Sequence, residues 1–514
     1  MSRLSKNIIY NFFGQGLLLV LGFVAVKYIF KQLGEDALGI IYFSAMMNAV
    51  LCAVLEMGIC STTVREVSVH FKSEPEYIKN LIRTFSLFYW SAYALLMIGI
   101  FFLAPVIVER WINLKTMDSA TAIYVLRILG IASLVALPKS FYTSLLRGLQ
   151  QMEFNNFIDV VTSGLQQFGT ILILALGGNL VHVVYWFTTC YGLGIVTYLI
   201  VSAHFFSLRA IVPGYSSPVV KRNLGFASRM MSISIIATIH TQADKVIISK
   251  LLPISTVGYY GVAYSNVSKG TLLTGAISQA AFPSFSALFN AGDRDALMTQ
   301  YRKLQDLLCC GIVPILAAIP FALLPLFSYI LNEETARVLL LPTTLICVGF
   351  YMNGTLNIPY VFTLAVGRPG IVARMNFYAL FVVLPVTALS IYFFGLTGAG
   401  LSWVFYHIFA YLYGVPRICS ECLKIPVWNW YLHILKIFVL IGVTYGVAWF
   451  IPGTIGNHSI LALTTAYIGG SIVFLTGSYF VIGKELRGTL FSYLKLFKTK
   501  ILGITKWIIH TQSH

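Results

Sequence analysis

Residues 85–108 read FSLFYWSAYALLMIGIFFLAPVIV, and no charged side chain interrupts them. A helix crosses the hydrocarbon core of a bilayer in about 20 predominantly apolar residues. Inside that core a backbone must satisfy its own hydrogen bonds, which leaves only helices and closed barrels. The stretch is too long and too uniformly apolar for a barrel strand. It therefore predicts a membrane-spanning helix.

Similar apolar stretches recur along the whole chain. Of its 514 residues 58% are hydrophobic and only 10% are charged, whereas about 25% are charged in a typical soluble domain. So little charge cannot cover a water-soluble surface. We predict an all-α membrane fold of about 14 transmembrane helices, at residues 8–30, 38–60, 85–108, 123–146, 157–176, 181–205, 224–248, 257–282, 307–331, 338–366, 377–394, 399–415, 434–451 and 460–482.

Lysine and arginine are distributed unevenly between the two sides of these helices. If the N-terminus is cytoplasmic, 25 of the 35 basic residues lie at cytoplasmic helix ends, in cytoplasmic loops or in the C-terminal tail. Five lie on the opposite side, namely Lys31, Arg110, Lys115, Lys250 and Arg337. By the positive-inside rule both termini are predicted to be cytoplasmic. The same distribution explains the net charge of +17. The charge therefore does not indicate a nucleic-acid partner.

Three pairs of landmarks indicate an internal repeat. Two pairs are separated by 219 residues and the third by 220, namely Gly39 with Gly258, Gly148 with Gly367, and Pro105 with Pro325. Six predicted helices fall in each copy, so both copies have the same topology. In transporters built this way the substrate path lies between the two halves. We predict lobes at 1–220 and 221–430, two further helices in 431–483 and a basic cytoplasmic tail at 484–514.

That tail spaces its apolar residues three or four apart, with lysines on other faces. This pattern is typical of an amphipathic helix lying on anionic phospholipids, and a frayed basic tail is the alternative interpretation.

Eight ionisable residues are predicted at membrane depth, where such groups are costly and usually face a cavity. Five are basic and three are acidic, so we predict a net cationic, water-filled cavity that binds an anionic substrate. The substrate-binding candidates are Lys27, Arg127, Lys139, Lys245 and Lys269, and the candidates for coupling to an ion are Glu56, Asp159 and Asp244.

Two other interpretations of these charges stay open. The residues could pair internally, for instance Asp244 with Lys269 or Glu56 with Arg127. Lysines near the outer helix ends, such as Lys27 and Lys245, could instead extend to the lipid headgroups. The sequence contains no Walker A loop, no Gly-x-Ser-x-Gly motif and no metal-ligand cluster. We therefore predict a protein that is not an enzyme and that uses no cofactor.

Residues 242–267, QADKVIISKLLPISTVGYYGVAYSNV, resemble the segment across helices seven and eight of the bacterial polysaccharide flippases. These are the O-antigen and capsule-repeat transporters of the multidrug/oligosaccharidyl-lipid/polysaccharide exporter superfamily. The pattern is an Asp, apolar residues, a polar break, and then Val-Gly-x-Tyr and Ala. The runs NIIYNFFGQG and RGLQQMEFNNF are similar to the first half of the same family. The resemblance covers about residues 1 to 480.

The resemblance implies a substrate and a mechanism. The substrate is an undecaprenyl-pyrophosphate-linked oligosaccharide, turned from the cytoplasmic to the periplasmic leaflet of the inner membrane by alternating access of two lobes. This step belongs to lipopolysaccharide O-antigen or capsule biosynthesis, with a glycan polymerase and a chain-length regulator as partners. The basic candidates would hold the pyrophosphate or acidic sugars, and aromatic side chains could stack on sugar rings, namely those of Tyr259, Tyr260, Tyr264 and Trp403.

The sequence also bears on three alternative functions. A drug or cation antiporter of the same superfamily would favour an acid-rich cavity, because its substrates are cations. A flippase for a lipid-linked peptidoglycan precursor would also need a cationic cavity, because its cargo is likewise anionic. This alternative therefore stays open. An O-antigen polymerase or ligase usually depends on a large periplasmic loop, and the longest predicted outer loop here is only 109–121.

Overall fold

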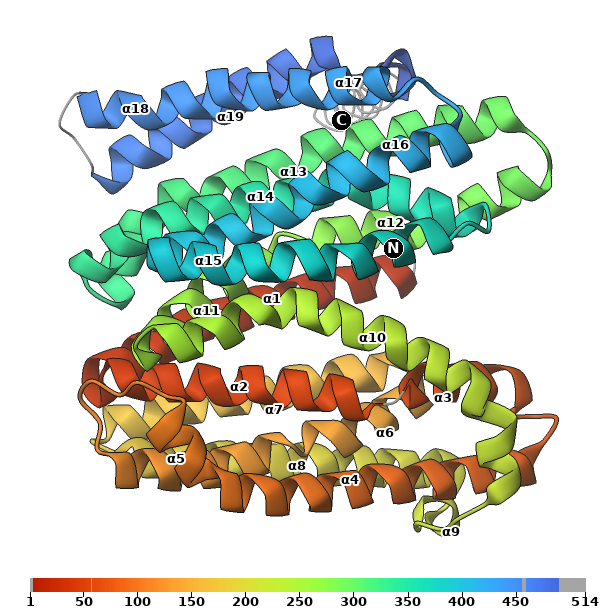
Figure 1. Cartoon of the computed structure of the whole chain (residues 1–514), viewed down its shortest axis with the longest axis vertical. Helices are drawn as coiled ribbons and strands as arrows, with labels where there is room; N and C mark the ends of the chain where they lie inside the picture. Colours follow the sequence, from red (N-terminus) through yellow and green to blue (C-terminus); the bar gives the residue numbers. More distant parts are fainter. Residues whose placement is uncertain (1–2, 57, 455–458, 490–514) are drawn as a thin grey trace, which may run out of the picture. The chain divides into compact units, whose positions relative to one another are not determined.

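The chain folds almost entirely into helices, which confirms the predicted all-α class (Figure 1). The computed structural model describes residues 3–56, 58–454 and 459–489. By their contacts these residues form two compact units, which are taken one at a time below. The predicted tail from residue 490 onward lies outside the described residues.

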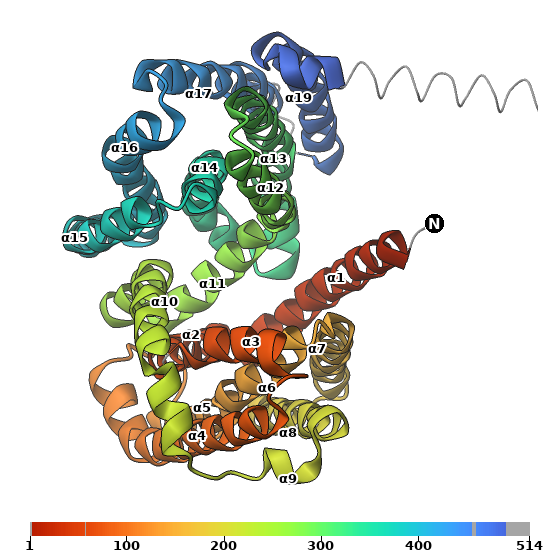
Figure 2. The same cartoon turned by 90° about the vertical axis from the view of Figure 1, so that its right-hand side faces the viewer.

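The first unit comprises Met1–Val262, Phe327–Leu339 and Leu384–Ala399. Its long helices pack in neighbouring pairs, α1 on α7, α7 on α8, α4 on α5 and α2 on α10 (Figure 2). The helices are α1 (Arg3–Tyr28), α2 (Glu35–Leu55), α3 (Ile59–His70), α4 (Pro75–Arg110), α5 (Ser119–Ser133), α6 (Ala136–Gly148), α7 (Met152–Ala175), α8 (Leu180–Phe206), α9 (Leu208–Ile211) and α10 (Ser217–Leu251), with a π-helical turn η1 (Ile29–Leu33) after α1.

Aromatic residues fill the core of this unit. Tyr89 on α4 stacks on Phe141 on α6 with ring centroids 5.4 Å apart. Tyr142, which is fully buried, takes part in hydrogen bonds with Ser86 and with the indole N–H of Trp90, each 3.0 Å long. A buried hydroxyl in an apolar surrounding is costly unless it is paired. The aromatic rings therefore fill the α4–α6 contact, and these hydrogen bonds fix its geometry.

The second unit comprises Ala263–Leu326, Leu340–Val383 and Gly400–His514. Helix α11 begins in the first unit and ends in the second. The helices that follow α10 are α11 (Ile254–Lys269), α12 (Leu272–Asn290), α13 (Arg294–Ile330), α14 (Glu333–Ala365), α15 (Gly370–Phe409), η2 (Ala410–Gly414), α16 (Val415–Arg417), η3 (Ile418–Leu423), α17 (Val427–Ile441), η4 (Gly442–Gly446), α18 (Val447–Thr454) and α19 (Ile460–Val481).

The helix count is consistent with the fourteen predicted spans. Among the described residues, eleven helical stretches are long and apolar enough to cross a membrane, or twelve if α11 and α12 form one bent span. One of the eleven, Gly370–Leu423, contains two predicted spans. The chain reverses within it at Gly395, whose φ of 57° is a left-handed conformation. A Cβ on Gly398 would lie 1.9 Å from the carbonyl oxygen of Ser390, so the two arms of this hairpin touch.

Two predicted spans of the first unit are broken rather than continuous. The second ends as a helix at Leu55 and resumes at Ile59, with Gly58 between them at a φ of 65°. A Cβ on Gly58 would lie 2.2 Å from the carbonyl oxygen of Ala227, so α10 crosses closely at this break. The fourth span consists of α5 and α6, which are separated at residues 134–135.

Candidate functional site

The eighth predicted span is interrupted in its middle. Helix α11 ends at Lys269 and α12 begins at Leu272, and the two pieces are bent by 43°. The Thr271 hydroxyl donates to the carbonyl of Ser268 at 2.6 Å and so does not cap α12. The first N–H groups of a helix lack intrahelical acceptors and form its positive end. Transporters commonly place such interrupted helices at their substrate or ion sites.

Lys269 lies at this break, and its side chain is exposed. Within the part of the chain that the structure describes, it makes no ion pair or hydrogen bond. Nearby on α12 the Thr274 side chain is only 3% exposed, and its hydroxyl has no partner among the described residues. The ammonium also lies at the C-terminal end of α11, where a cation is favourable. An ammonium and a positive helix end together suit an anion.

The second candidate, Lys245, is buried in a polar cluster of the first unit. Its Nζ donates to the Thr241 carbonyl at 2.6 Å and lies 3.3 Å from Asp244 Oδ1. Tyr260 on α11 donates to Asp244 Oδ2 at 2.6 Å and lies 3.3 Å from the carbonyl oxygen of Ala399. This cluster joins α10, α11 and the end of the Gly395 hairpin. A buried ion pair with these hydrogen bonds is also a structural element.

Two further basic candidates have partners on neighbouring helices. Lys139 on α6 pairs with Asp159 on α7 at 2.8 Å, and the Tyr198 hydroxyl donates to the same carboxylate at 3.2 Å. Arg127 on α5 donates to the carbonyl of Phe101 at 3.0 Å and lies over that residue's ring.

Lys27 and Glu56 make weaker contacts. The Lys27 ammonium lies 3.4 Å from the ring centroid of Tyr329, a cation–π contact. The Glu56 carboxylate lies beside the Cys60 thiol. Neither of the ion pairs weighed from the sequence, Asp244–Lys269 or Glu56–Arg127, is present among the described residues. Lys269 is thus the deep basic candidate with no described partner.

The repeat-related glycines Gly39 and Gly258 lie against each other. A Cβ on Gly39 would be 2.3 Å from the carbonyl oxygen of Ile254, and a Cβ on Gly258 would be 2.9 Å from the amide nitrogen of Gly39. Side chains larger than hydrogen cannot occupy either position without a shift of the backbone. The N-terminal ends of α2 and α11 are therefore closed together, with Leu38 and Val257 buried beside them.

Asp36 anchors the loop after α4 to this closed end. The Asp36 side chain is 1% exposed, and its Oδ2 accepts N–H groups of the loop, from Lys115 at 2.8 Å, Thr116 at 2.7 Å and Met117 at 3.1 Å. The same loop accepts a hydrogen bond at the Asn113 carbonyl from the N–H of Ile254 at 2.9 Å. The loop is thus held by α2 and by the start of α11. This arrangement was not predicted from the sequence.

A polar network joins the opposite end of α10 to α3 and α4. Glu66 on α3 is 4% exposed and accepts from the Tyr77 hydroxyl at 2.9 Å and from Arg65 Nε at 2.8 Å. Arg222 on α10 donates to Glu74 at 2.8 Å and lies over the Tyr77 ring. This network was not predicted from the sequence, because no local pattern relates positions 66, 74 and 222.

The Arg222 guanidinium lowers the pKa of the Glu74 carboxyl, mainly through their hydrogen bond. A carboxylate with a depressed pKa keeps its charge above its ordinary range and loses it as the pH falls through the lowered value. The pair is therefore ionised at neutral pH.

Comparison with known proteins identifies the family. Residues 4–289 match the model of the family described as "Polysaccharide biosynthesis protein". The Shigella flexneri protein named "Putative O-antigen transporter" is 19% identical over 408 residues, which are 77% of this chain and 93% of that protein.

Solved transporters share the fold. The lipid II flippase MurJ in an inward closed conformation gives a TM-score of 0.70 at 13% identity, over 92% of this chain and 98% of that one. An inward-facing MATE transporter of the MOP superfamily gives 0.65 at 15% identity, over 78% and 95%. These relatives are transporters rather than catalysts, which confirms the prediction of a multi-pass membrane protein that is not an enzyme. The fold of the chain is similar to that of these solved transporters, and the chain belongs to the family described as "Polysaccharide biosynthesis protein".

Proposed function

We propose that this protein is a flippase for an undecaprenyl-pyrophosphate-linked oligosaccharide in the biosynthesis of a surface polysaccharide. It moves the substrate from the cytoplasmic to the outer leaflet by alternating access of two lobes, 1–220 and 221–430. Family membership and the name of the Shigella flexneri relative support this class of cargo. The two helices within 431–483 and the tail stand outside the two lobes.

The observation that carries the proposal is the interruption of the eighth span at Lys269. A pyrophosphate needs cationic or N–H partners at membrane depth, and this break provides an ammonium without a described partner beside an uncapped helix N-terminus. Lysine acts there as a point charge for phosphate. Lys27, Lys245, Arg127 and Lys139 remain proposed contributors to the positive field of the path.

The membrane potential can drive this transport. Moving one elementary charge across the membrane is worth roughly 2.3 kcal/mol per 100 mV, so an anionic cargo moving outward gains energy from an inside-negative potential. If a proton or sodium ion is exchanged, the candidates are Asp244, Glu56 and Asp159. Of these, Asp244 contacts both Lys245 and Tyr260, so a proton bound there would weaken the link between α10 and α11.

Reconstitution tests the proposal directly. Proteoliposomes containing the purified chain should turn a fluorescent pyrophosphate-linked oligosaccharide to the opposite leaflet, where a membrane-impermeant quencher reaches it. The expected rate is at least about tenfold above that of protein-free vesicles, because spontaneous transfer of charged groups through hydrocarbon is strongly disfavoured.

Parallel assays separate the alternatives. Lipid-linked peptidoglycan precursor moving equally fast would extend the cargo class to both lipids. Export of a cationic dye driven by a proton or sodium gradient, with no movement of the glycolipid, would replace the proposal with the drug-antiporter alternative.

We also propose that the chain lies in the bacterial cytoplasmic membrane with both termini in the cytoplasm. The skewed distribution of basic residues supports this orientation. A reporter enzyme that is active only in the cytoplasm, fused after His514, should be active, and the same reporter inserted in the 111–118 loop should be silent. The reverse pattern would invert the direction of transport proposed here. Anionic phospholipids, a glycan polymerase and a chain-length regulator are the proposed partners.

A further inference from the structure

A polar pocket lies in the second unit where the N-terminal part of α13 meets α17 and the segment after α19. It has a volume of about 310 Å³. Its walls include Tyr301, Gln305 and Asp306 from α13, Trp430 and His433 from α17, and Glu485. None of these residues was a candidate from the sequence. Asp306 lies one position before the predicted ninth span.

Several polar groups of the pocket are buried and incompletely satisfied. Asp306 is 4% exposed, with one carboxylate oxygen 2.7 Å from His433 Nε2 and the other accepting from the N–H of Gly483 at 2.6 Å. Gln305 is 3% exposed and donates to the Thr355 carbonyl, while its Oε1 has no partner among the described residues. A buried acceptor without a donor is costly.

The Tyr301 hydroxyl and the Trp430 indole N–H are also buried in the pocket wall. These two polar groups lie close to each other, but they do not have the geometry of a full hydrogen bond. Both rings belong to the wall, so the pocket combines aromatic faces with acceptor atoms. This combination is typical of sites for organic ammonium groups.

The charges of the pocket favour a cation inside and an anion at its mouth. When His433 is neutral, the lining carries two carboxylates, Asp306 and Glu485, and one guanidinium, Arg302. Its net charge is then negative. Arg302 is 58% exposed and contacts Glu485 at 3.3 Å, which leaves other guanidinium N–H groups for a second partner. An ammonium deep in the pocket and a phosphate beside Arg302 would satisfy both regions.

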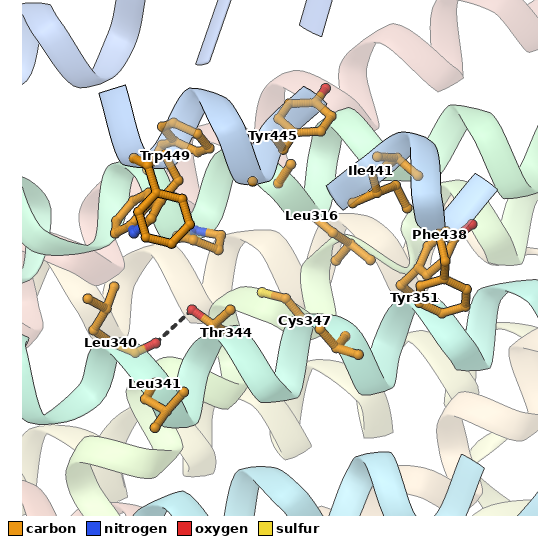
Figure 3. Close-up of a pocket in the computed structure, with 17 residues that line it drawn as sticks. Leu316, Leu340, Leu341, Thr344, Cys347, Tyr351, Phe438, Ile441, Tyr445 and Trp449 are labelled. Carbon is orange, nitrogen blue, oxygen red and sulfur yellow. Dashed lines mark hydrogen bonds between the residues drawn. The ribbon is translucent and has the colours of Figure 1, made fainter. Parts of the chain in front are cut away.

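An apolar groove of about 440 Å³ lies further along the same helices, α13 and α17 (Figure 3). On α13 the groove begins at Val313, two turns after Asp306, and on α17 it begins at Phe438, five residues after His433. Its walls include Leu316, Phe438, Tyr445 and Trp449. The Thr344 hydroxyl in the wall donates to the Leu340 carbonyl at 2.8 Å and so adds no free polar group.

We propose that the polar pocket and the apolar groove together bind a phospholipid with a primary-amine headgroup. The ammonium lies beside the carboxylates of Asp306 and Glu485, against the Tyr301 and Trp430 rings. The phosphate lies beside Arg302, and one acyl chain follows the groove. A headgroup with net negative charge would meet the carboxylates unfavourably, and a free amine would leave the groove unused.

The experiment uses the full-length protein, freed of lipid in detergent, with three phospholipids that carry identical acyl chains. Binding of phosphatidylethanolamine, phosphatidylcholine and phosphatidylglycerol is measured by native mass spectrometry. We expect phosphatidylethanolamine to bind about tenfold more tightly than the others, the factor that one charge-assisted hydrogen bond typically gives. Glu485→Gln should reduce this preference. Glu333→Gln, which removes a carboxylate on α14 that also pairs with an arginine, Arg337, but lies outside the pocket, should leave it unchanged.

Substitutions in the groove test the position of the chain. A Cβ on Gly446, which lines the groove, meets no atom within 4 Å, and neither does one on Gly442 in the same π-helical turn. Gly446→Leu should therefore weaken binding of all three lipids about tenfold by filling the space, and Gly442→Leu should not.

Equal affinity for phosphatidylglycerol would refute recognition of an amine, and equal effects of the two glycine variants would refute the placement of the chain. A polyprenyl phosphate that displaces phosphatidylethanolamine and binds more tightly would make the transported lipid the occupant instead. These binding results do not depend on transport, so they stand apart from the outcome of the flippase assay.

Discussion

Replacing Lys269 with glutamate is expected to abolish export of the surface polysaccharide while the amount of protein in the membrane stays unchanged. The substitution puts a negative charge where the pyrophosphate is proposed to bind, beside the N-terminus of α12. Loss of one charge-assisted contact, about 1.5–3 kcal/mol, corresponds to a factor of about 10 to 100 in transport. Alanine should have a smaller effect, because it removes attraction without adding repulsion.

The matched control is Lys484→Glu, which changes the net charge equally at an exposed position outside the predicted spans. Surface glycan is quantified by gel and by lectin or antibody labelling, and the protein by immunoblot of membranes. Normal export in both Lys269 variants would eliminate this residue from the substrate path. Equal losses for alanine and glutamate would indicate packing rather than charge.

Replacing Gly39 with valine is expected to stop export by a different route. The new Cβ would overlap the carbonyl oxygen of Ile254, 2.3 Å away, and overpacking of this kind typically costs 1–3 kcal/mol. The ends of α2 and α11 should then fail to close. Gly258→Val should act in the same way, since its Cβ would meet the backbone of Gly39.

Chemical labelling checks this mechanism. Ser255 is fully buried at the closed end, so Ser255→Cys in a cysteine-free background should resist a membrane-impermeant maleimide applied from outside. Adding Gly39→Val should make it reactive. Gly192→Val is the control, because a Cβ at that helical position meets no atom within 4 Å. Unchanged labelling together with normal export would show that the close glycine contact is not required.

The sequence predicts the spans well because their signal is local. Each predicted span corresponds to described helix, and the hairpin at Gly395 falls in the glycine-rich gap between the predicted eleventh and twelfth spans. The interruption at Gly58 was not predicted, because one glycine within an apolar stretch is compatible with a continuous helix. The lobe boundary at residue 220 stays a prediction about which helices move together.

The site was only partly predictable, since hydropathy finds deep charges without finding their partners. Asp159 and Lys139 were both candidates, but their pairing depends on how α6 meets α7. Gly39 and Gly258 were matched as repeat landmarks, and only the folded chain brings them into contact. Asp306 was not among the candidates, because it lies one position before the predicted ninth span, although it is buried.

The anchoring of the loop by Asp36 has a kinetic consequence. In the proposed cycle the outer end must open between the lobes, while three N–H bonds to Asp36 hold the loop on α2 within the first lobe. Because the loop is held in this way, the hydrogen bond from Ile254 to the Asn113 carbonyl breaks together with the glycine contact. Opening is then a single infrequent event on the microsecond-to-millisecond scale of collective helix motions. The dwell time of the closed state, more than the speed of the cargo, would set the turnover rate.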